Sequence, residues 1–124
     1  MSVQITNRLT EFRKLLRAAA EEVAPNVTWR AATGPTRYQE LNVDEQTFSL
    51  IGVVGPVTPE NEDFLDELLD SHGMHSIRLA LESDRQLASA MDVRVLSTTG
   101  ARPYPQPDET IYIGAEWKVQ ALFD

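Results

Sequence analysis

The most regular pattern in this chain is an alternation of apolar and mostly polar positions from Thr110 to Phe123. Every second residue is apolar: Ile111, Ile113, Ala115, Trp117, Val119, Ala121 and Phe123. Since successive side chains of a strand point to opposite faces, this spacing predicts one long strand with an apolar face against a core. The strand would be about twice the usual length. We therefore expect that it can extend beyond the body of the domain and pair with a neighbouring chain.

Two further segments have helical periodicity. Residues 6–24 carry apolar side chains at spacings of three and four, which predicts an amphipathic helix that ends before Pro25. A second helix is expected to begin at Thr58, which can cap it, with Pro59 at the first helical position. Gly73 should bend or break this helix before the apolar pattern resumes toward Asp84.

Shorter apolar runs predict strands at 27–31, 48–54 and 91–95, the last able to pair antiparallel with the C-terminal strand. The segment 33–46 has little periodicity and predicts a long loop or an irregular arm. Three prolines between Thr98 and Asp108 predict another irregular loop. The resulting order predicts an α+β fold in a single domain, residues 1–124, in which one mainly antiparallel four-stranded sheet packs against two helices.

Composition narrows the classes of function. The chain has 124 residues, 19 acidic against 11 basic ones, a formal charge of −8 and no cysteine. Phosphate binding needs clustered Lys and Arg, so this balance argues against a surface that grips nucleic acid. An acidic surface would suit a passage through which DNA slides without sticking, although solubility is the simpler explanation. Without cysteine there is no disulfide and no thiolate zinc site, and no apolar run approaches the roughly 20 residues of a membrane span.

Two groups of residues were candidates for chemistry. His72 and His75 are spaced by three, with Glu67 and Asp70 nearby, but no recognised metal motif surrounds them. We expect two partly exposed histidines at a helix break. The second helix also carries a group of acidic residues: Glu60, Glu62, Asp63, Asp66, Glu67 and Asp70. A solvated helix face is the most favoured explanation for them, an acidic interaction surface comes second, and a catalytic pair is the least favoured. No phosphate-binding loop or nucleophile elbow is present, so we predict no catalytic residue, no metal site and no cofactor.

The segment from Ile77 to Leu96 carries an Ala-Leu-x-x-Asp-x-x-Leu pattern at Ala80, Leu81, Asp84 and Leu87. Together with the loop and the alternating strand that follow, it resembles the C-terminal half of the tail terminator proteins of long-tailed bacteriophages. The leading amphipathic helix and the size of the chain are also similar to that family. The chain departs from the family at Ala88–Ala90, where many members have a glycine-rich turn, and nothing in the family matches residues 33–46.

The resemblance implies a single tail-terminator-like domain that acts by assembly, without catalytic residues or a cofactor. It implies a homo-oligomeric ring, typically a hexamer, that caps the tail tube, ends its polymerisation and joins it to the head-side connector or stopper protein. DNA would pass through the lumen without specific binding, and no membrane would be involved. The protein would be part of the virion, in the tail or neck, after assembly in the host cytoplasm.

We expect the ring contacts to come from the loops at 33–46 and 98–109 and from polar positions of the last strand. The candidate interface residues are Arg37, Tyr38, Glu40, Arg102, Tyr104, Glu116 and Lys118. For Tyr104, among three prolines, packing on its own domain is equally favoured. Two alternatives stay open: another neck or head-completion protein of the same kind of particle, and a monomeric acidic adaptor or inhibitor. A small enzyme using His72 or His75 is the least favoured.

Overall fold

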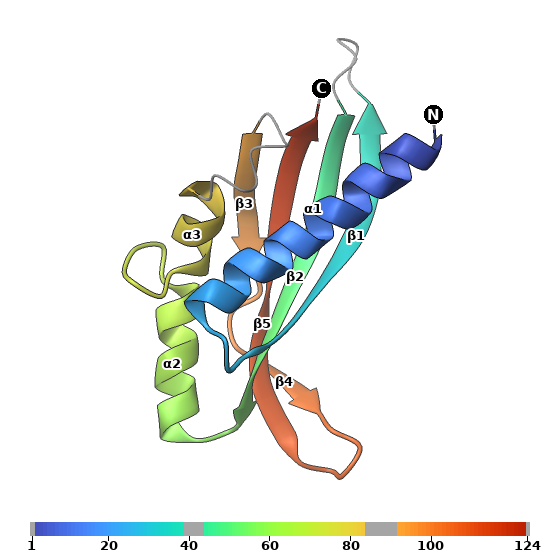
Figure 1. The fold of residues 1–124 in the computed structure, drawn as a ribbon. Helices are drawn as coiled ribbons and strands as arrows, with labels where there is room; N and C mark the ends of the chain where they lie inside the picture. Colours follow the sequence, from blue (N-terminus) through green and yellow to red (C-terminus); the bar gives the residue numbers. More distant parts are fainter. Residues whose placement is uncertain (1, 39–43, 84–91, 124) are drawn as a thin grey trace.

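The computed structural model describes residues 2–38, 44–83 and 92–123, and in it three helices pack on one face of a five-stranded sheet (Figure 1). In chain order the elements are α1 (Ser2–Val23), β1 (Thr28–Tyr38), β2 (Asp44–Pro56), α2 (Pro59–Leu69), α3 (Ile77–Ser83), β3 (Asp92–Thr98), β4 (Arg102–Pro105) and β5 (Ile111–Phe123). The predicted α+β class is confirmed. The sheet has a fifth strand, β4, and the second predicted helix is divided into α2 and α3.

The long C-terminal strand β5 organises the sheet. The strand order is β1-β2-β5-β3, and β4 also pairs with β5, with every pairing antiparallel. One side of β5 pairs with β2 from Tyr112 to Phe123. The other side pairs with β4 near Ile111 and with β3 near Leu122. The predicted antiparallel pairing of the third and last strands is therefore confirmed.

The core lies between this sheet and the helices. On β5 the buried side chains are those at alternate positions: Ile113, Ala115, Trp117, Val119, Ala121 and Phe123. The ring of Phe12, from α1, lies 4.9 Å from that of Phe48 and 5.3 Å from that of Phe123, centroid to centroid. Leu65 and Leu68 bring the inner side of α2 into the same cluster. The alternation predicted from the sequence therefore separates the two faces of β5: its apolar positions from Ile113 to Phe123 face the core, and the side chains between them face outward.

The predicted loop at 33–46 is wrong over most of its length, since β1 continues to Tyr38 and β2 begins at Asp44. The pairing of β1 with β2 shifts register between Thr33 and Thr36, which places Gly34 and Pro35 in a bulge. Proline has no backbone N–H, so in a central strand it would leave one hydrogen bond to a neighbouring strand unmade. Because β1 is an edge strand with one neighbour, Pro35 is accepted in the bulge. Residues 39–43 lie outside the described part.

The predicted irregular loop between Thr98 and Asp108 is also wrong in part. Residues Arg102–Pro105 form β4, with Arg102 opposite Gly114 and Tyr104 opposite Tyr112. Pro103 and Pro105 are tolerated because β4 pairs with β5 on one side only. The loop therefore closes a β-hairpin, and this hairpin extends beyond the helical layer at one end of the molecule (Figure 1).

The signals for the second helix are confirmed. Thr58 accepts a hydrogen bond at its Oγ1 from the backbone N–H of Asn61 at 3.1 Å, and Pro59 opens α2. Gly73, with φ 109°, lies in the break before α3. None of the described helices is long and apolar enough to cross a membrane. Asp84, Leu87 and Ala88–Ala90, which belong to the resemblance to tail terminators, lie outside the described residues.

Candidate functional site

The candidate interface residues fall into two groups at opposite ends of the sheet. Arg37 and Tyr38 occupy the end of β1, and β2 separates them from Phe123 at the same end of the sheet. Arg102 and Tyr104 lie on β4, beside the start of β5. Nine strand positions separate Gly114, opposite Arg102, from Phe123, which corresponds to roughly 30 Å. The two groups therefore cannot form one contact site, and Glu40 lies outside the described residues.

Arg102 lines one hollow with two further candidate interface residues on β5, Glu116 and Lys118. These three residues surround a space of about 290 Å³ together with Ser97, Thr98 and Thr99. The hollow lies where β3 ends and β4 begins, both beside β5. Two hydrogen bonds hold Thr99 to β5: its N–H donates to the carbonyl of Glu116 at 3.0 Å, and its Oγ1 accepts from the N–H of Glu116 at 3.1 Å. The structure thus brings together charges of both signs at a firmly held turn.

Tyr104 lies at the margin of this group. Partial burial raises the pKa of its phenol, the carboxylate of Glu116 raises it further, and the guanidinium of Arg102 opposes both effects. The side chain is half-buried. Tyr104 thus packs partly on its own hairpin and exposes the rest, and a role as a contact residue stays a prediction.

The sheet face opposite the helices presents a mixed polar surface. Lys118 is exposed, while Glu116, Gln120 and Leu122 are half-buried on the same side of β5. Gln120 donates a hydrogen bond across the sheet to the carboxylate of Glu45 on β2. No described helix crosses this face (Figure 1). A flat surface of this composition can make contact with another protein without exposing a large apolar area.

The two histidines lie in the connection between α2 and α3. His75 Nδ1 lies 3.1 Å from a carboxylate oxygen of Glu67, and His72 Nδ1 lies 2.8 Å from Ser71 Oγ. His72, His75, Glu67 and Asp70 line one open hollow. Across the part of the chain that the structure describes, however, no three His, Asp or Glu side chains gather closely enough to hold a metal ion.

The acidic residues of α2 all face solvent. Glu60 and Glu62 lie in its first turn, where the helix dipole favours negative charge, and α2 contains no basic residue. Phe64, Leu65, Leu68 and Leu69 form the opposite, inward side. The expected separation of an acidic face from an apolar face is present, and the carboxylates are placed on the outside of the molecule.

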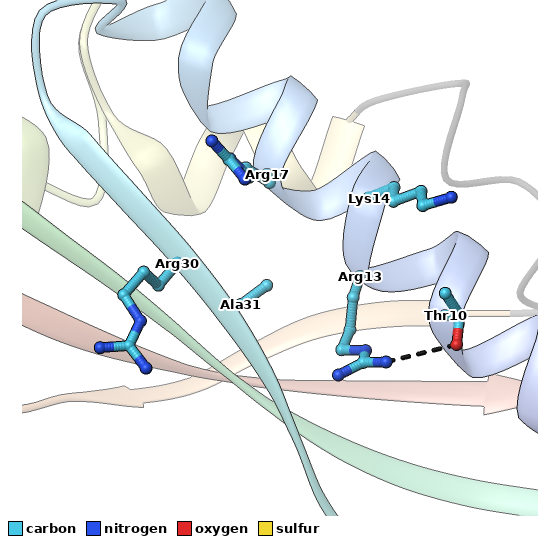
Figure 2. A pocket seen from close by; sticks show the side chains of 6 residues that line it. All are labelled: Thr10, Arg13, Lys14, Arg17, Arg30 and Ala31. Atoms are coloured by element: carbon cyan, nitrogen blue, oxygen red, sulfur yellow. Dashed lines mark hydrogen bonds between the residues drawn. The ribbon is translucent and has the colours of Figure 1, made fainter.

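A basic groove between α1 and β1 was not predicted from the sequence. It has a volume of about 300 Å³ and is lined by Thr10, Arg13, Lys14, Arg17, Arg30 and Ala31 (Figure 2). The three basic residues of α1 that line the groove are separated by one and three positions, which places them on neighbouring faces of the helix. The available signal was the charge of the N-terminal segment: residues 1–38 hold six of the 11 basic residues and three of the 19 acidic ones.

Comparison with known proteins gives no relative from which a site could be transferred. No family model matches the chain, and none of the curated proteins matches it. Function is therefore inferred from the surfaces of this chain and from the resemblance carried by its sequence pattern.

Proposed function

We propose that this protein is a structural virion protein of the tail terminator type. In this role it forms a homo-oligomeric ring on the last ring of the tail tube, ends polymerisation of the tube and offers a docking surface to the head-side connector. Its partners are further copies of itself, the tail tube protein and the connector or stopper protein. It acts through surface complementarity in the neck of the particle, without a reaction.

The observation that carries the proposal is the hairpin of β4 and β5. Strand β5 has 13 residues, and with β4 it extends past the layer of helices (Figure 1). Such a projection contributes little to the core of its own domain, since Ile111 is half exposed and β4 has no buried residue. A strand pair that extends away from a small body supports a role in contacts with other chains.

The charge distribution supports the same function. A subunit with a net charge of −8 would surround a central channel with negative potential, and such a wall repels the phosphate backbone of DNA. DNA could then move through the ring without being held by it. The polar sheet face and the hollow at Arg102, Glu116 and Lys118 supply surfaces for the tube or the connector.

The experiment that tests this function combines the mass in solution with electron microscopy. Light scattering at several concentrations, and negative-stain images of the same samples, should show rings with an open centre, either alone or after addition of the cognate tube protein. Addition of the protein during tube assembly should fix tube length. Rings that leave tube length unchanged would favour another neck or head-completion protein. A protein that stays monomeric even with tube protein would contradict the proposal and favour the adaptor.

A further inference from the structure

Charge is unevenly distributed over this molecule. Residues 1–38, which contain α1 and β1, carry six basic and three acidic residues, whereas residues 39–124 carry five basic and 16 acidic ones. In Figure 1, β1 and the N-terminal half of α1 lie at one margin of the molecule, and α2 lies at the opposite margin. The basic residues of this first segment and the acidic residues of α2 therefore form two different surfaces of one subunit.

The positive surface is the basic groove between α1 and β1. Four cationic side chains and no carboxylate line it. Lys14 and Arg17 each have an exposed glutamate partner on α1, at 3.5 and 2.7 Å. Among the described residues, neither Arg13 nor Arg30 forms an ion pair.

Arg13 has a hydrogen-bond donor that lacks an acceptor within the described part of the chain. Its guanidinium donates one hydrogen bond, from Nη2 to Thr10 Oγ1 at 3.3 Å (Figure 2). Its Nε is buried and finds no acceptor among the described residues. A buried donor without an acceptor is costly, and a carboxylate is the acceptor that a guanidinium binds best. The exposed cationic side chains beside Arg13, those of Lys14, Arg17 and Arg30, give the groove the chemistry to accept a carboxylate from outside the subunit.

The negative surface is α2. Its acidic residues repeat at spacings of three and four, as between Asp63, Asp66 and Glu67, so like charges face each other along the helix. Its last turn has no basic residue, and Asp66 and Glu67 lie close to the negative end of the helix dipole. Within the subunit this arrangement is unfavourable, and a cationic partner outside the subunit would offset it.

We infer that the basic groove of one copy binds the acidic face of α2 of a second copy, in a head-to-tail contact. Copies with a charge of −8 repel one another, so a stable contact requires that opposite charges meet in it. Because the two surfaces are different, the contact is heterologous and repeats from copy to copy, which is how closed rings arise. This inference rests on the proposed ring and names the surfaces that join its subunits.

The test exchanges the charges of the two surfaces. One variant carries Arg13→Glu and Arg30→Glu, a second carries Asp63→Lys and Asp66→Lys, and a third carries all four changes. Arg78→Glu with Arg94→Glu is the matched control, since it changes the net charge as the groove variant does at exposed positions outside the groove. Circular dichroism checks folding. If Arg13→Glu prevents it, Arg17→Glu with Arg30→Glu replaces the first variant, because both side chains are exposed.

The readout is oligomer mass by light scattering, at low and at moderate salt and in the presence of tube protein if rings need it. We expect each one-sided variant to need at least a tenfold higher concentration than the wild type for assembly. The four-fold exchange should restore assembly, and the control should assemble like the wild type. An equal mixture of the two one-sided variants should also assemble, because in an alternating ring each reversed groove meets a reversed α2 and each unchanged groove meets an unchanged α2.

The remaining outcomes separate this inference from the proposed function. Rings that persist in both one-sided variants would overturn the inference and leave the ring function standing. Open-ended or dimeric assemblies that the one-sided changes dissolve would support the inference and contradict the terminator role. A wild-type protein that stays monomeric under all conditions would contradict both. Binding of a DNA duplex that the groove variant loses, with unchanged assembly, would make the groove a phosphate site and overturn the inference.

Discussion

Gly52 lies directly against the indole ring of Trp29 in the core of the domain. The two residues are opposite each other in the pairing of β1 with β2, and a Cβ at position 52 would lie 2.5 Å from Cζ3 of Trp29. Trp29 is almost fully buried, and its Nε1 donates a hydrogen bond to the carbonyl of Ala24 at 3.0 Å. The indole therefore has little freedom to move away, and the absence of a side chain at Gly52 is what makes room for it.

Replacement of Gly52 by Ala should destabilise the fold by about 1–3 kcal/mol, as is typical when extra atoms are forced into a packed core. Urea denaturation followed by circular dichroism measures the change. Ser49→Ala is the matched control, since Ser49 lies on the same strand but points to the opposite face. Its effect should be within about 0.5 kcal/mol.

The cause can be tested by removing the ring. In a Trp29→Leu background, the atoms of the benzene ring that would meet the added Cβ are gone. Gly52→Ala should then cost less than it does in the wild type, although Trp29→Leu is itself destabilising. An equal cost in both backgrounds would show that the strain comes from the backbone and not from the contact with Trp29.

Gln46 supplies the next prediction. It is a fully buried side chain on β2, and its Nε2 donates to the carbonyl of Thr47 at 3.0 Å and to the carbonyl of Gly34 in the bulge of β1. Gln46→Glu keeps the shape but places a carboxylate against two carbonyl oxygens. We expect a loss of about 3 kcal/mol or more at neutral pH, since the carboxylate oxygen that replaces Nε2 would face these two acceptors in a buried position.

The sign of the pH dependence identifies the cause. Burial raises the pKa of the introduced carboxyl above its value in the unfolded chain. Such a group favours the folded state only below its unfolded pKa, and that advantage is lost as pH rises through the folded pKa. The difference in urea midpoint between Gln46→Glu and wild type should therefore be smaller at pH 4 than at pH 7. A difference that does not change with pH would mean that shape, not charge, is responsible.

The strand and helix assignments that follow from long periodic patterns are those that the sequence predicted well. The alternation from Ile111 to Phe123 matches β5, and the cap at Thr58 with Pro59 marks the start of α2. In these segments local propensity and burial favour the same structure. The sequence pattern alone is therefore enough to assign the helix or strand.

The errors arise where a strand is held by its neighbours. Gly34 and Pro35 indicate a loop locally, yet β1 continues past them because the bulge and the amide of Gln46 satisfy its backbone. The prolines of β4 are likewise accepted because only one side of that strand is paired. These strand pairings and the contact with Gln46 depend on the register of the sheet, which the sequence pattern alone does not specify.

The basic groove was missed for a related reason. Arg13 and Arg30 are 17 positions apart and belong to different elements, and they line one groove only because α1 packs beside β1. Overall composition, with its charge of −8, directs attention to the acidic residues. The candidate interface residues divided into two groups for the same reason, since their grouping depends on strand register.

The tip of the projecting hairpin allows a test by a single residue. Glu109 has φ 71° in the turn between β4 and β5, a left-handed conformation that costs a non-glycine residue roughly 1–2 kcal/mol. Glu109→Gly should remove this cost, partly offset by the greater freedom of glycine in the unfolded chain. We expect an unchanged or slightly higher urea midpoint, whereas Asp108→Gly, at a position without positive φ, should lower it. A clear loss of stability in Glu109→Gly would show that the Glu109 side chain itself holds the turn.

The neighbouring pair Asp108 and Thr110 gives a prediction that is independent of overall stability. The carboxylate of Asp108 accepts hydrogen bonds from the hydroxyl of Thr110 at 2.5 Å and from its backbone N–H at 3.1 Å. The hydroxyl bond is the largest cause that lowers the pKa of Asp108, and the backbone bond adds to it. Thr110→Val keeps the shape and the backbone bond but removes the hydroxyl. The pKa of Asp108 should therefore rise part of the way toward its ordinary value.

Titration of the Asp108 carboxyl by NMR measures this shift, with Thr28→Val, an exposed change on β1, as the variant that should leave it unaltered. A carboxyl whose folded pKa is depressed stabilises the fold above its unfolded pKa, and this contribution is lost as pH falls through the folded pKa. The hairpin of the wild type should thus lose more order on acidification than that of Thr110→Val. If both proteins give the same Asp108 titration, the hydroxyl bond is not what holds the turn. The hairpin would then have to be ordered by two backbone hydrogen bonds, from the N–H of Gln106 to the carbonyl of Thr110 and from the N–H of Glu109 to the carbonyl of Gln106. Acidification does not break these bonds.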